Sequence, residues 1–364
     1  MFGCLFTLDY EIHGNGDGCP YELMVEPTER LLRLFDQYGA KLTIMADVAE
    51  IIKFKEYWQE HNEDVFYFNQ IKQQLQQAIL SGHDVQLHIH SSYFGSKFSN
   101  GSWDQNWLEY SLAELPYDRL FEIIGICKSF LEELIQPVQP DYRCSVFRAA
   151  NWSMSPSYNI VQALINNGIK IDTSVWKYGK WDKIVQFDYS NAHSDLIPWY
   201  IDPNDVCRNS LEGKLLEIPI YCEERSIWHF ITRNRLFRLN QASKHKHPAS
   251  KFGYSAATQS AEKKTKSTVS KLKGLLTKKH AWKLDFNQCT GKQMIKALER
   301  IEKKYEHLDC DIPVVSIGHS KLFTAQNSRS LESFLKYVAN EQSKYYFATF
   351  DEFDTTTFRA LSIP

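Results

Sequence analysis

Short apolar runs alternate with amphipathic helical stretches about seven times along this chain of 364 residues. Runs typical of buried strands fall at 4–8, 41–45, 84–90, 145–147, 169–173, 215–221, 313–317 and 345–350. Between them, apolar residues recur with helical spacing at 27–39, 71–82, 120–131, 155–168, 294–301 and 331–338. This alternation predicts a parallel sheet with helices outside, and the number of repeats favours a closed or nearly closed barrel.

Motif content and composition weigh against several other classes of protein. No glycine-rich phosphate fingerprint follows an early strand, which weakens the dinucleotide-binding alternative. The formal net charge of −2 gives no global field for nucleic acid, and no apolar run approaches the length of a membrane span. The eight cysteines are scattered without a CxxC pair, so we expect reduced thiols. Because no export signal precedes the first strand, we expect a soluble, cytoplasmic protein.

One segment, residues 232–285, departs from the alternation. It holds many lysines and arginines against only two acids, Glu262 and Asp285. We interpret it as a basic, partly flexible insertion within a single domain that spans residues 1–364. It is either a solvated loop with a basic helix or a patch for an anionic partner, such as a phosphate-bearing substrate, an acidic glycan or the headgroups of an anionic membrane.

Polar side chains recur at the C-terminal ends of the predicted strands. Asp9 and Glu11 end the first strand, and because alternate residues of a strand share a face, both carboxylates point to one side. Later strands end in further polar residues, which are His88, His90, Arg148, Asp172 and His319. Parallel barrel strands bring such ends together around one mouth, so we expect these side chains to form one site.

The residue types in this set suit hydrolysis of an amide or an ester. Two histidines at i, i+2 together with a carboxylate can bind a divalent metal and leave positions open for water. Water held by such an ion is acidic enough to attack a carbonyl near neutral pH. A second carboxylate can accept the proton as general base, and a histidine across the cleft can protonate the leaving amine.

Each of these residues also has a purely structural alternative. A His-x-His pair on a strand is more often structural, and Arg148 could simply pair with a carboxylate inside the barrel. Asp172 could cap a turn, and His319 could be a loop residue. The occurrence of all of them at strand ends, in barrel order, favours the functional interpretation.

Five segments resemble, in order, the motifs of the polysaccharide deacetylase family, a carbohydrate esterase type with the NodB-homology fold. The segment Thr7-Leu8-Asp9-Tyr10-Glu11 resembles the first motif in a D-x-E variant. The second to fifth motifs are resembled, in order, by the segments GHDVQLHIH at 82–90, FRAAN at 147–151, IDTS at 171–174 and IGHS at 317–320. LEIP at 216–219 and FATFDEF at 347–353 also look like segments of the family. The resemblance covers nearly the whole chain except the basic insertion.

The resemblance implies a fold, a cofactor and roles for the site residues. The fold would be a distorted (β/α) barrel of about seven parallel strands, and the cofactor a divalent ion of the zinc type, with cobalt or nickel as alternatives. The metal ligands would be Glu11, His88 and His90. The catalytic residues would be Asp9 as general base, Arg148 holding it, His319 as general acid and Asp172 tuning that acid.

The chain departs from the family's pattern in two of these positions. The family places its second histidine four residues after the first, where this chain has Ser92, so His90 would substitute for it. The first motif lacks adjacent aspartates, so the roles of Asp9 and Glu11 could be exchanged.

We therefore expect a metal-dependent hydrolase that removes an acetyl group from a sugar, by N- or O-deacetylation, in the synthesis of a surface polysaccharide or lipopolysaccharide. The acetylated sugar would be nucleotide- or lipid-linked, and we expect no nucleic-acid partner. Two alternatives remain open. One is a cyclic-amide hydrolase in the same barrel, and the other is a catalytically inactive glycan-binding or assembly module.

Overall fold

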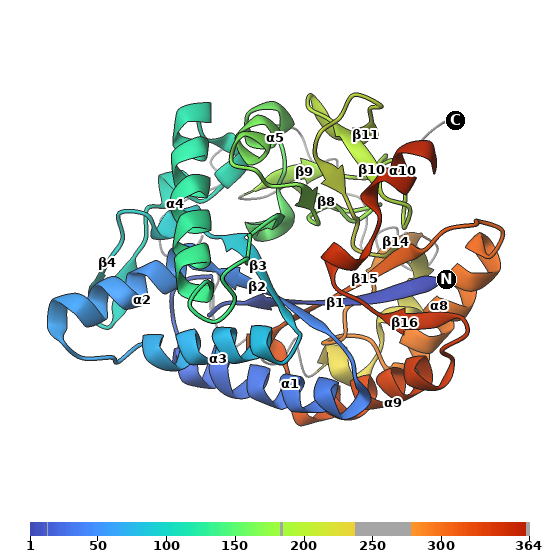
Figure 1. Ribbon diagram of the computed structural model, residues 1–364, viewed down its shortest axis with the longest axis horizontal. Helices are drawn as coiled ribbons and strands as arrows, with labels where there is room; N and C mark the ends of the chain where they lie inside the picture. Colours follow the sequence, from blue (N-terminus) through green and yellow to red (C-terminus); the bar gives the residue numbers. More distant parts are fainter. Residues whose placement is uncertain (13, 183–184, 237–277, 362–364) are drawn as a thin grey trace, which may run out of the picture.

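The computed structural model describes residues 1–12, 14–182, 185–236 and 278–361, and a curled sheet of mostly parallel strands lies at its centre (Figure 1). Its parallel strands are β1 (Phe2–Tyr10), β2 (Leu42–Asp47), β3 (Asp84–Ile89), β6 (Val146–Ala149), β7 (Ile171–Asp172), β12 (Leu216–Glu217), β15 (Ile312–His319) and β16 (Tyr345–Phe347). Two antiparallel strands, β10 (Trp199–Asp202) and β11 (Asp205–Asn209), extend it beyond β12. The predicted parallel sheet is confirmed, whereas the predicted count of about seven parallel strands is not, because the described sheet has ten strands and only two of them are antiparallel.

The order of the strands is β11-β10-β12-β7-β6-β3-β2-β1-β15, with β16 also paired to β1. One parallel bridge, between Ile220 and Val315, links the chain just after β12 back to β15. The Tyr221 N–H strengthens this link by donating to the carbonyl of Val315 over 3.0 Å. The sheet is therefore curled almost into a barrel. Ile220 and Tyr221, which follow the end of β12, make the closing link to β15.

Each face of the sheet carries its own apolar core. The larger core fills the space between the sheet and the helices. The smaller core is enclosed by the curl, and its members include Leu5, Met45, Val146, Ile171 and Val315. These inner residues exclude water below the end of the sheet where the parallel strands terminate.

Helices cover the outside of the curled sheet (Figure 1). They are α1 (Glu26–Tyr38), α2 (Val48–His61), α3 (Phe68–Leu80), α4 (Tyr117–Ile135), α5 (Ser157–Asn166), α8 (Gly291–Tyr305), α9 (Ala325–Asn340) and α10 (Thr355–Leu361). Helix α1 ends at Gly39, whose φ of 63° lies in the left-handed region that glycine adopts without strain. Helix α2 is not among the predicted helices, because its sequence is rich in β-branched and aromatic residues and lacks a clear apolar stripe.

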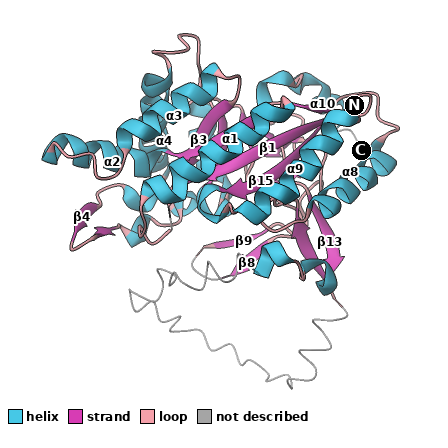
Figure 2. Cartoon of the chain, turned by 90° about the horizontal axis from the view of Figure 1, so that it is seen from below, coloured by secondary structure: helices cyan, strands magenta, loops and turns pink. Residues whose placement is uncertain are grey.

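A two-stranded ribbon, β13 (Cys222–Ser226) and β14 (Lys279–Lys283), joins the predicted insertion to the barrel (Figure 2). Residues 237–277, which include the lysines at 263, 264, 266, 271 and 273, lie outside the described residues. The described end of the insertion is well packed, because Trp282 and Asp285 are buried and Asp285 forms a parallel bridge with Ile317. The C-terminal end of the predicted insertion is therefore anchored to the barrel through β14 and Asp285.

All eight cysteines are free thiols, and six of them are buried. Across the described ranges, the helices are too short or too polar to cross a bilayer.

Candidate metal centre

Asp9 and Glu11 point into the curl of the sheet. Asp9 lies four residues after Leu5, so the pleat directs both side chains to the inner face. Glu11 follows two residues later, with only 4% of its surface exposed. Two buried carboxylates at one strand end require compensating charge, which later strands supply.

The register of the strands aligns the predicted residues. Asp9 is the backbone partner of His319 on β15, and His88 on β3 is the partner of Arg148 on β6 and of Asp47 on β2. Partners in register share a face, so these side chains form a ring above the inner apolar core. The ring is the predicted mouth of the barrel.

Glu11, His88 and His90 form a cluster whose ligand atoms all lie within 4.8 Å of one another. The Nε2 atoms of His88 and His90 lie 3.4 and 3.0 Å from Glu11 Oε2. Around a tetrahedral zinc ion, nitrogen and oxygen ligand atoms lie roughly 3.3 Å apart, so this spacing fits one ion. Glu11 Oε2 is buried and faces both imidazoles, so all three ligand atoms converge on one point. The cluster thus has the donor set of a small metal centre.

A hydrogen bond fixes the ring of His88, and a carboxylate lies behind the ring of His90. His88 Nδ1 lies 2.9 Å from the carbonyl oxygen of Arg148, which can only accept, so Nδ1 carries the proton and Nε2 faces Glu11. Asp47 accepts a hydrogen bond from the backbone N–H of His90 over 3.1 Å, and its other oxygen lies 3.7 Å from His90 Nδ1. A carboxylate behind a histidine is the usual support of a metal ligand.

Lys321 lies in a single turn of 3-10 helix that follows β15, and its positive charge balances the charge of Glu11. Its ammonium donates to Glu11 Oε1 over 2.7 Å and to the carbonyl of Ile12 over 2.8 Å. Burial would raise the pKa of the Glu11 carboxyl, but the charges of Lys321, His90 and His88 outweigh burial, so this pKa lies well below its ordinary value. Glu11 is therefore held as an anion, as a metal ligand must be.

A second polar cluster, centred on Asp9, lies beside the first. Arg148 Nη1 donates to Asp9 Oδ1 over 2.8 Å, and His319 Nε2 lies 3.4 Å from Asp9 Oδ2. The guanidinium is itself fixed by a 3.0 Å hydrogen bond from Nε to the carbonyl of Thr173. Burial would raise the pKa of Asp9, but Arg148, His319 and His88 lower it below its ordinary value. Asp9 is therefore ionised and oriented.

His319 stands at the end of β15 between Asp9 and an aromatic wall. Its backbone N–H donates to Asn287 Oδ1 over 2.6 Å. The ring of Trp152 meets the imidazole edge-on, with centroids 6.1 Å apart. The preceding residue, Gly318, lets Phe286 pack against β15, because a Cβ there would overlap the ring of Phe286.

Asp172 is placed differently from the other predicted residues. It is the register partner of Phe147, which packs in the outer core, so the pleat directs it away from the face of Arg148. Its Oδ1 accepts a 2.6 Å hydrogen bond from Ser174, and its carboxyl also meets that of Glu217. Burial, then the charge of Asp172, raises the pKa of Glu217 well above its ordinary value. The expected tuning of His319 by Asp172 stays a prediction.

Four residues that support the site were given no role by sequence reasoning: Asp47, Glu217, Asn287 and Lys321. Asp47 ends a strand as the predicted residues do, which was an available signal. Lys321 follows His319 closely in sequence, whereas Asn287 reaches the site only through tertiary packing. Ser92, which occupies the family's second histidine position, is buried and donates to Gln105 over 2.8 Å, apart from the metal cluster.

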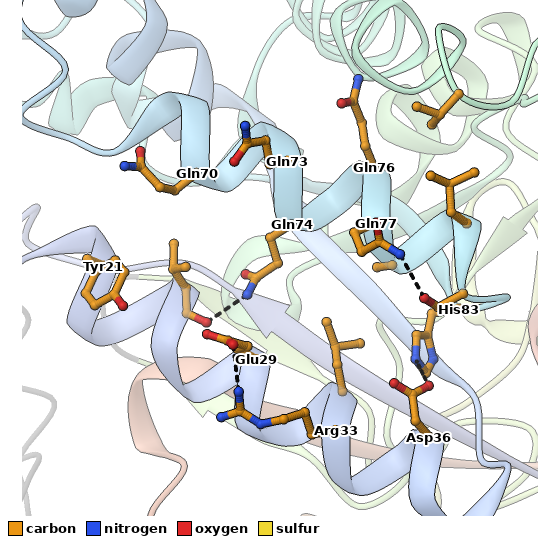
Figure 3. A pocket seen from close by; sticks show the side chains of 16 residues that line it. Tyr21, Glu29, Arg33, Asp36, Gln70, Gln73, Gln74, Gln76, Gln77 and His83 are labelled. Atoms are coloured by element: carbon orange, nitrogen blue, oxygen red, sulfur yellow. Dashed lines mark hydrogen bonds and ion pairs between the residues drawn. The ribbon is translucent and has the colours of Figure 1, made fainter.

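A separate hollow of about 670 Å³ lies between α1 and α3 (Figure 3). Its lining is rich in glutamine, and Gln74 donates to the carbonyl of Val25 across it over 2.8 Å. At its far end His83 contacts Asp36 over 3.1 Å. The predicted site residues do not line this hollow.

Comparison by sequence yields neither a matching family model nor a matching curated protein.

Comparison by structure finds solved proteins that share the arrangement of the chain. A protein described as a polysaccharide deacetylase, from Mycobacterium smegmatis, is 13% identical and matches over 100% of this chain and 91% of its own, with a TM-score of 0.50. A GH57 branching enzyme from Thermococcus kodakaraensis is 12% identical over 96% of this chain and 70% of its own, with a TM-score of 0.50. The PuuE allantoinase is 13% identical and matches over 99% of this chain and 89% of its own, with a TM-score of 0.48. At these identities, the first two similarities concern the fold alone, and they support the predicted barrel-like architecture.

Proposed function

We propose that this chain is a metal-dependent hydrolase that removes an acetyl group from an acetylated sugar, acting on an amide or an ester. The observation that carries the proposal is the cluster of Glu11, His88 and His90 beside the buried pair of Asp9 and Arg148. A metal-ligand set, an oriented carboxylate and a histidine at one mouth are the parts that acyl hydrolysis requires. The fold shared with a protein described as a polysaccharide deacetylase supports this class.

Zinc is the ion that we propose for the cluster, with cobalt or nickel as substitutes. Two imidazole nitrogens and one carboxylate leave coordination positions open, which is typical of catalytic rather than structural sites. When bound, a divalent ion would supply Lewis-acid chemistry, which lowers the pKa of a water and polarises an acyl carbonyl. Glu11, His88 and His90 would hold the ion, and Lys321 and Asp47 would orient two of them.

The protein's own groups move the protons in this proposal. Asp9 is ionised at neutral pH and would accept the proton of the attacking water, while Arg148 fixes its orientation. His319 would donate a proton to the leaving amine or alkoxide. We retain Asp172 as a residue that tunes His319, acting from beneath the site rather than within it.

The biological setting that we propose is the cytoplasmic synthesis of a surface polysaccharide or lipopolysaccharide. The acetylated sugar would then be attached to a nucleotide or a lipid carrier, and the basic insertion would meet phosphates or an anionic membrane.

The test combines metal analysis with product analysis. Purified protein should contain about one equivalent of zinc, cobalt or nickel, and should release acetate from a panel of acetylated sugars. Ring opening of cyclic amides without acetate release would reassign the chain to the cyclic-amide hydrolases. Neither metal nor product would favour an inactive glycan-binding or assembly module.

A further inference from the structure

A strongly basic hollow of about 490 Å³ lies at the base of the β13–β14 ribbon. Its cationic lining residues are Arg225, Arg233, Lys292, Lys296 and Arg300. Three of them, Lys292, Lys296 and Arg300, recur every four residues along α8, so they project from one face of that helix. Like charges at this spacing repel one another, and a bound anion would relieve that repulsion.

The acidic residue at this hollow neutralises only part of its charge. Glu223 accepts two 2.9 Å hydrogen bonds from Arg300 and also pairs with Arg225. Among the described residues, Arg233, Lys292 and Lys296 form no ion pair with an acid. Burial, then the charges of Arg225 and Arg300, lowers the pKa of His229 at the edge of the hollow. The hollow therefore keeps a net positive potential.

A neighbouring hollow of about 390 Å³ borders the basic hollow and extends to Trp152, which packs against His319. The two share His229, Thr232 and Trp282 as lining residues. The second hollow is also lined by Trp152 and Trp176, whose rings meet edge-on with centroids 6.1 Å apart. Trp152 is the residue that packs against His319, so the aromatic wall begins at the proposed general acid.

A cation already lies against this aromatic wall. Lys283 Nζ is 3.5 Å from the ring centroid of Trp152 and 4.4 Å from that of Trp176. Aromatic faces stack on sugar rings, and a lysine beside them adds attraction for an anionic substituent. His319 is thus followed on its outer side by the two tryptophans, and these are followed by the cations of the basic hollow.

We propose that the acetylated sugar carries a phosphate ester, and that the basic hollow binds this phosphate while the sugar ring packs on Trp152 and Trp176. This inference rests on the proposed deacetylase function and adds the recognition element of its substrate. Arginine forks and lysine ammonium groups are the side chains that bind phosphate oxygens most strongly. A nucleoside diphosphate sugar and a lipid diphosphate sugar share this chemistry.

The decisive variant reverses two charges in the basic hollow, Lys292→Glu with Lys296→Glu. A matched control reverses two exposed lysines elsewhere, Lys303→Glu with Lys336→Glu. The first readout is acetate release from an N-acetylhexosamine joined to uridine diphosphate, compared with the same sugar without phosphate. We expect the ratio of the two kcat/KM values to fall at least about tenfold in the hollow variant and to persist in the control. An unchanged ratio in the hollow variant would overturn the inference.

The second readout needs no catalysis. Titration calorimetry with pyrophosphate should show salt-sensitive binding to the wild type and the control, and roughly tenfold weaker binding to the hollow variant. Equal binding by all three proteins would overturn the inference. If no sugar yields acetate while the calorimetry shows the expected loss, the proposed deacetylation fails and the phosphate site stands.

The same assay distinguishes the two sources of phosphate. The acetylated sugar is supplied either on uridine diphosphate or on a polyprenyl diphosphate in detergent. Preferred turnover of the first identifies a nucleotide sugar as substrate, and preferred turnover of the second identifies a lipid-linked sugar.

Discussion

Arg148 holds Asp9 through a 2.8 Å hydrogen bond between two side chains that come from opposite sides of the curled sheet and are both almost fully buried. The second oxygen of Asp9 is thereby directed at His319, 3.4 Å away. The guanidinium therefore fixes the direction of the proposed base and contributes most among the charges that keep it ionised.

The charge of Asp9 should be needed for turnover but not for metal binding. Asp9→Asn keeps the shape of the side chain and removes its basicity. We expect kcat for acetate release to fall about 100-fold or more while the metal content stays at the wild-type level. Elemental analysis and steady-state kinetics on the same preparation check this. Loss of the metal would instead show that Asp9 and Glu11 have exchanged roles.

Removing Arg148 should destabilise the fold in a pH-dependent way. Arg148→Met leaves Asp9 as a buried anion without its guanidinium, at a cost of about 3 kcal/mol at pH 7. Without the guanidinium, burial should raise the pKa of Asp9 in the folded variant above its unfolded value, so protonation relieves the unpaired buried charge as the pH falls. The difference in unfolding free energy between wild type and variant should therefore shrink from pH 7 to pH 4 in urea titrations. A constant difference would contradict this origin.

Each ligand of the candidate metal centre should be required for metal binding. His88→Ala, His90→Ala and Glu11→Gln should each lose most of the bound metal, whereas His61→Ala, on an exposed helix end, should keep it. Retention in His90→Ala would remove His90 from the cluster.

Metal affinity should also fall in acid. Burial would lower the pKa of His88, but its hydrogen bond to Glu11 and the charge of Asp9 raise it to about 9. Below that pH, the ion must displace a proton from His88, so apparent affinity should fall by up to about tenfold per pH unit. Competition with a metal-sensitive dye between pH 6 and 9 measures this slope. A flat profile would place the proton elsewhere.

The substitution Glu217→Gln should not destabilise the fold. Its pKa is raised well above the ordinary value, so the folded protein is progressively destabilised as the pH rises above the unfolded pKa. Glu217→Gln removes that effect, and the new amide can donate to Asp172 as the protonated acid does. We expect the variant to gain stability relative to wild type from pH 5 to pH 8, by about 1 kcal/mol or more. A relative loss over that range would show that Glu217 is ionised.

Gly318 and Phe286 should be energetically coupled. Gly318→Ala pushes a methyl group into the Phe286 ring and should cost about 1–3 kcal/mol of unfolding free energy. Phe286→Leu should recover part of this loss in the double variant, which a double-mutant cycle from urea unfolding would measure. If the two changes in unfolding free energy simply add, the backbone rather than the Phe286 ring moves to accommodate the methyl group.

Much of the fold follows from local sequence patterns. The alternation of apolar runs with amphipathic helices predicts the parallel strands, and Gly39 marks the end of α1 as expected. The antiparallel strands β10 and β11 carry no comparable signal, because they are short and pair only with each other and with β12. Helix α2 was missed because local propensity there contradicts the helix that tertiary packing imposes.

Part of the candidate site also follows from local sequence patterns. Side chains at i, i+2 of an extended segment share a face, so the alternation groups His88 with His90, and Glu11 joins them because β1 and β3 both flank β2. The face on which Asp172 lies could not be predicted, because β7 pairs over only two residues and its orientation depends on its register with β6. The contacts of Lys321 and Asn287 at the site could not be predicted, because they depend on how distant segments pack together.

The pairing of β1 with β15 also has a kinetic consequence. Thr7 donates a hydrogen bond to the carbonyl of Ser316, 309 positions away, and the edge of β1 not held by β15 is shared between β2 and β16. The strand that carries Asp9 therefore keeps an open edge until the distant segment docks, and contacts at such sequence separation form slowly. Folding intermediates that expose this edge are the species most prone to aggregate, so recovery of active protein depends on how quickly the two ends of the chain meet.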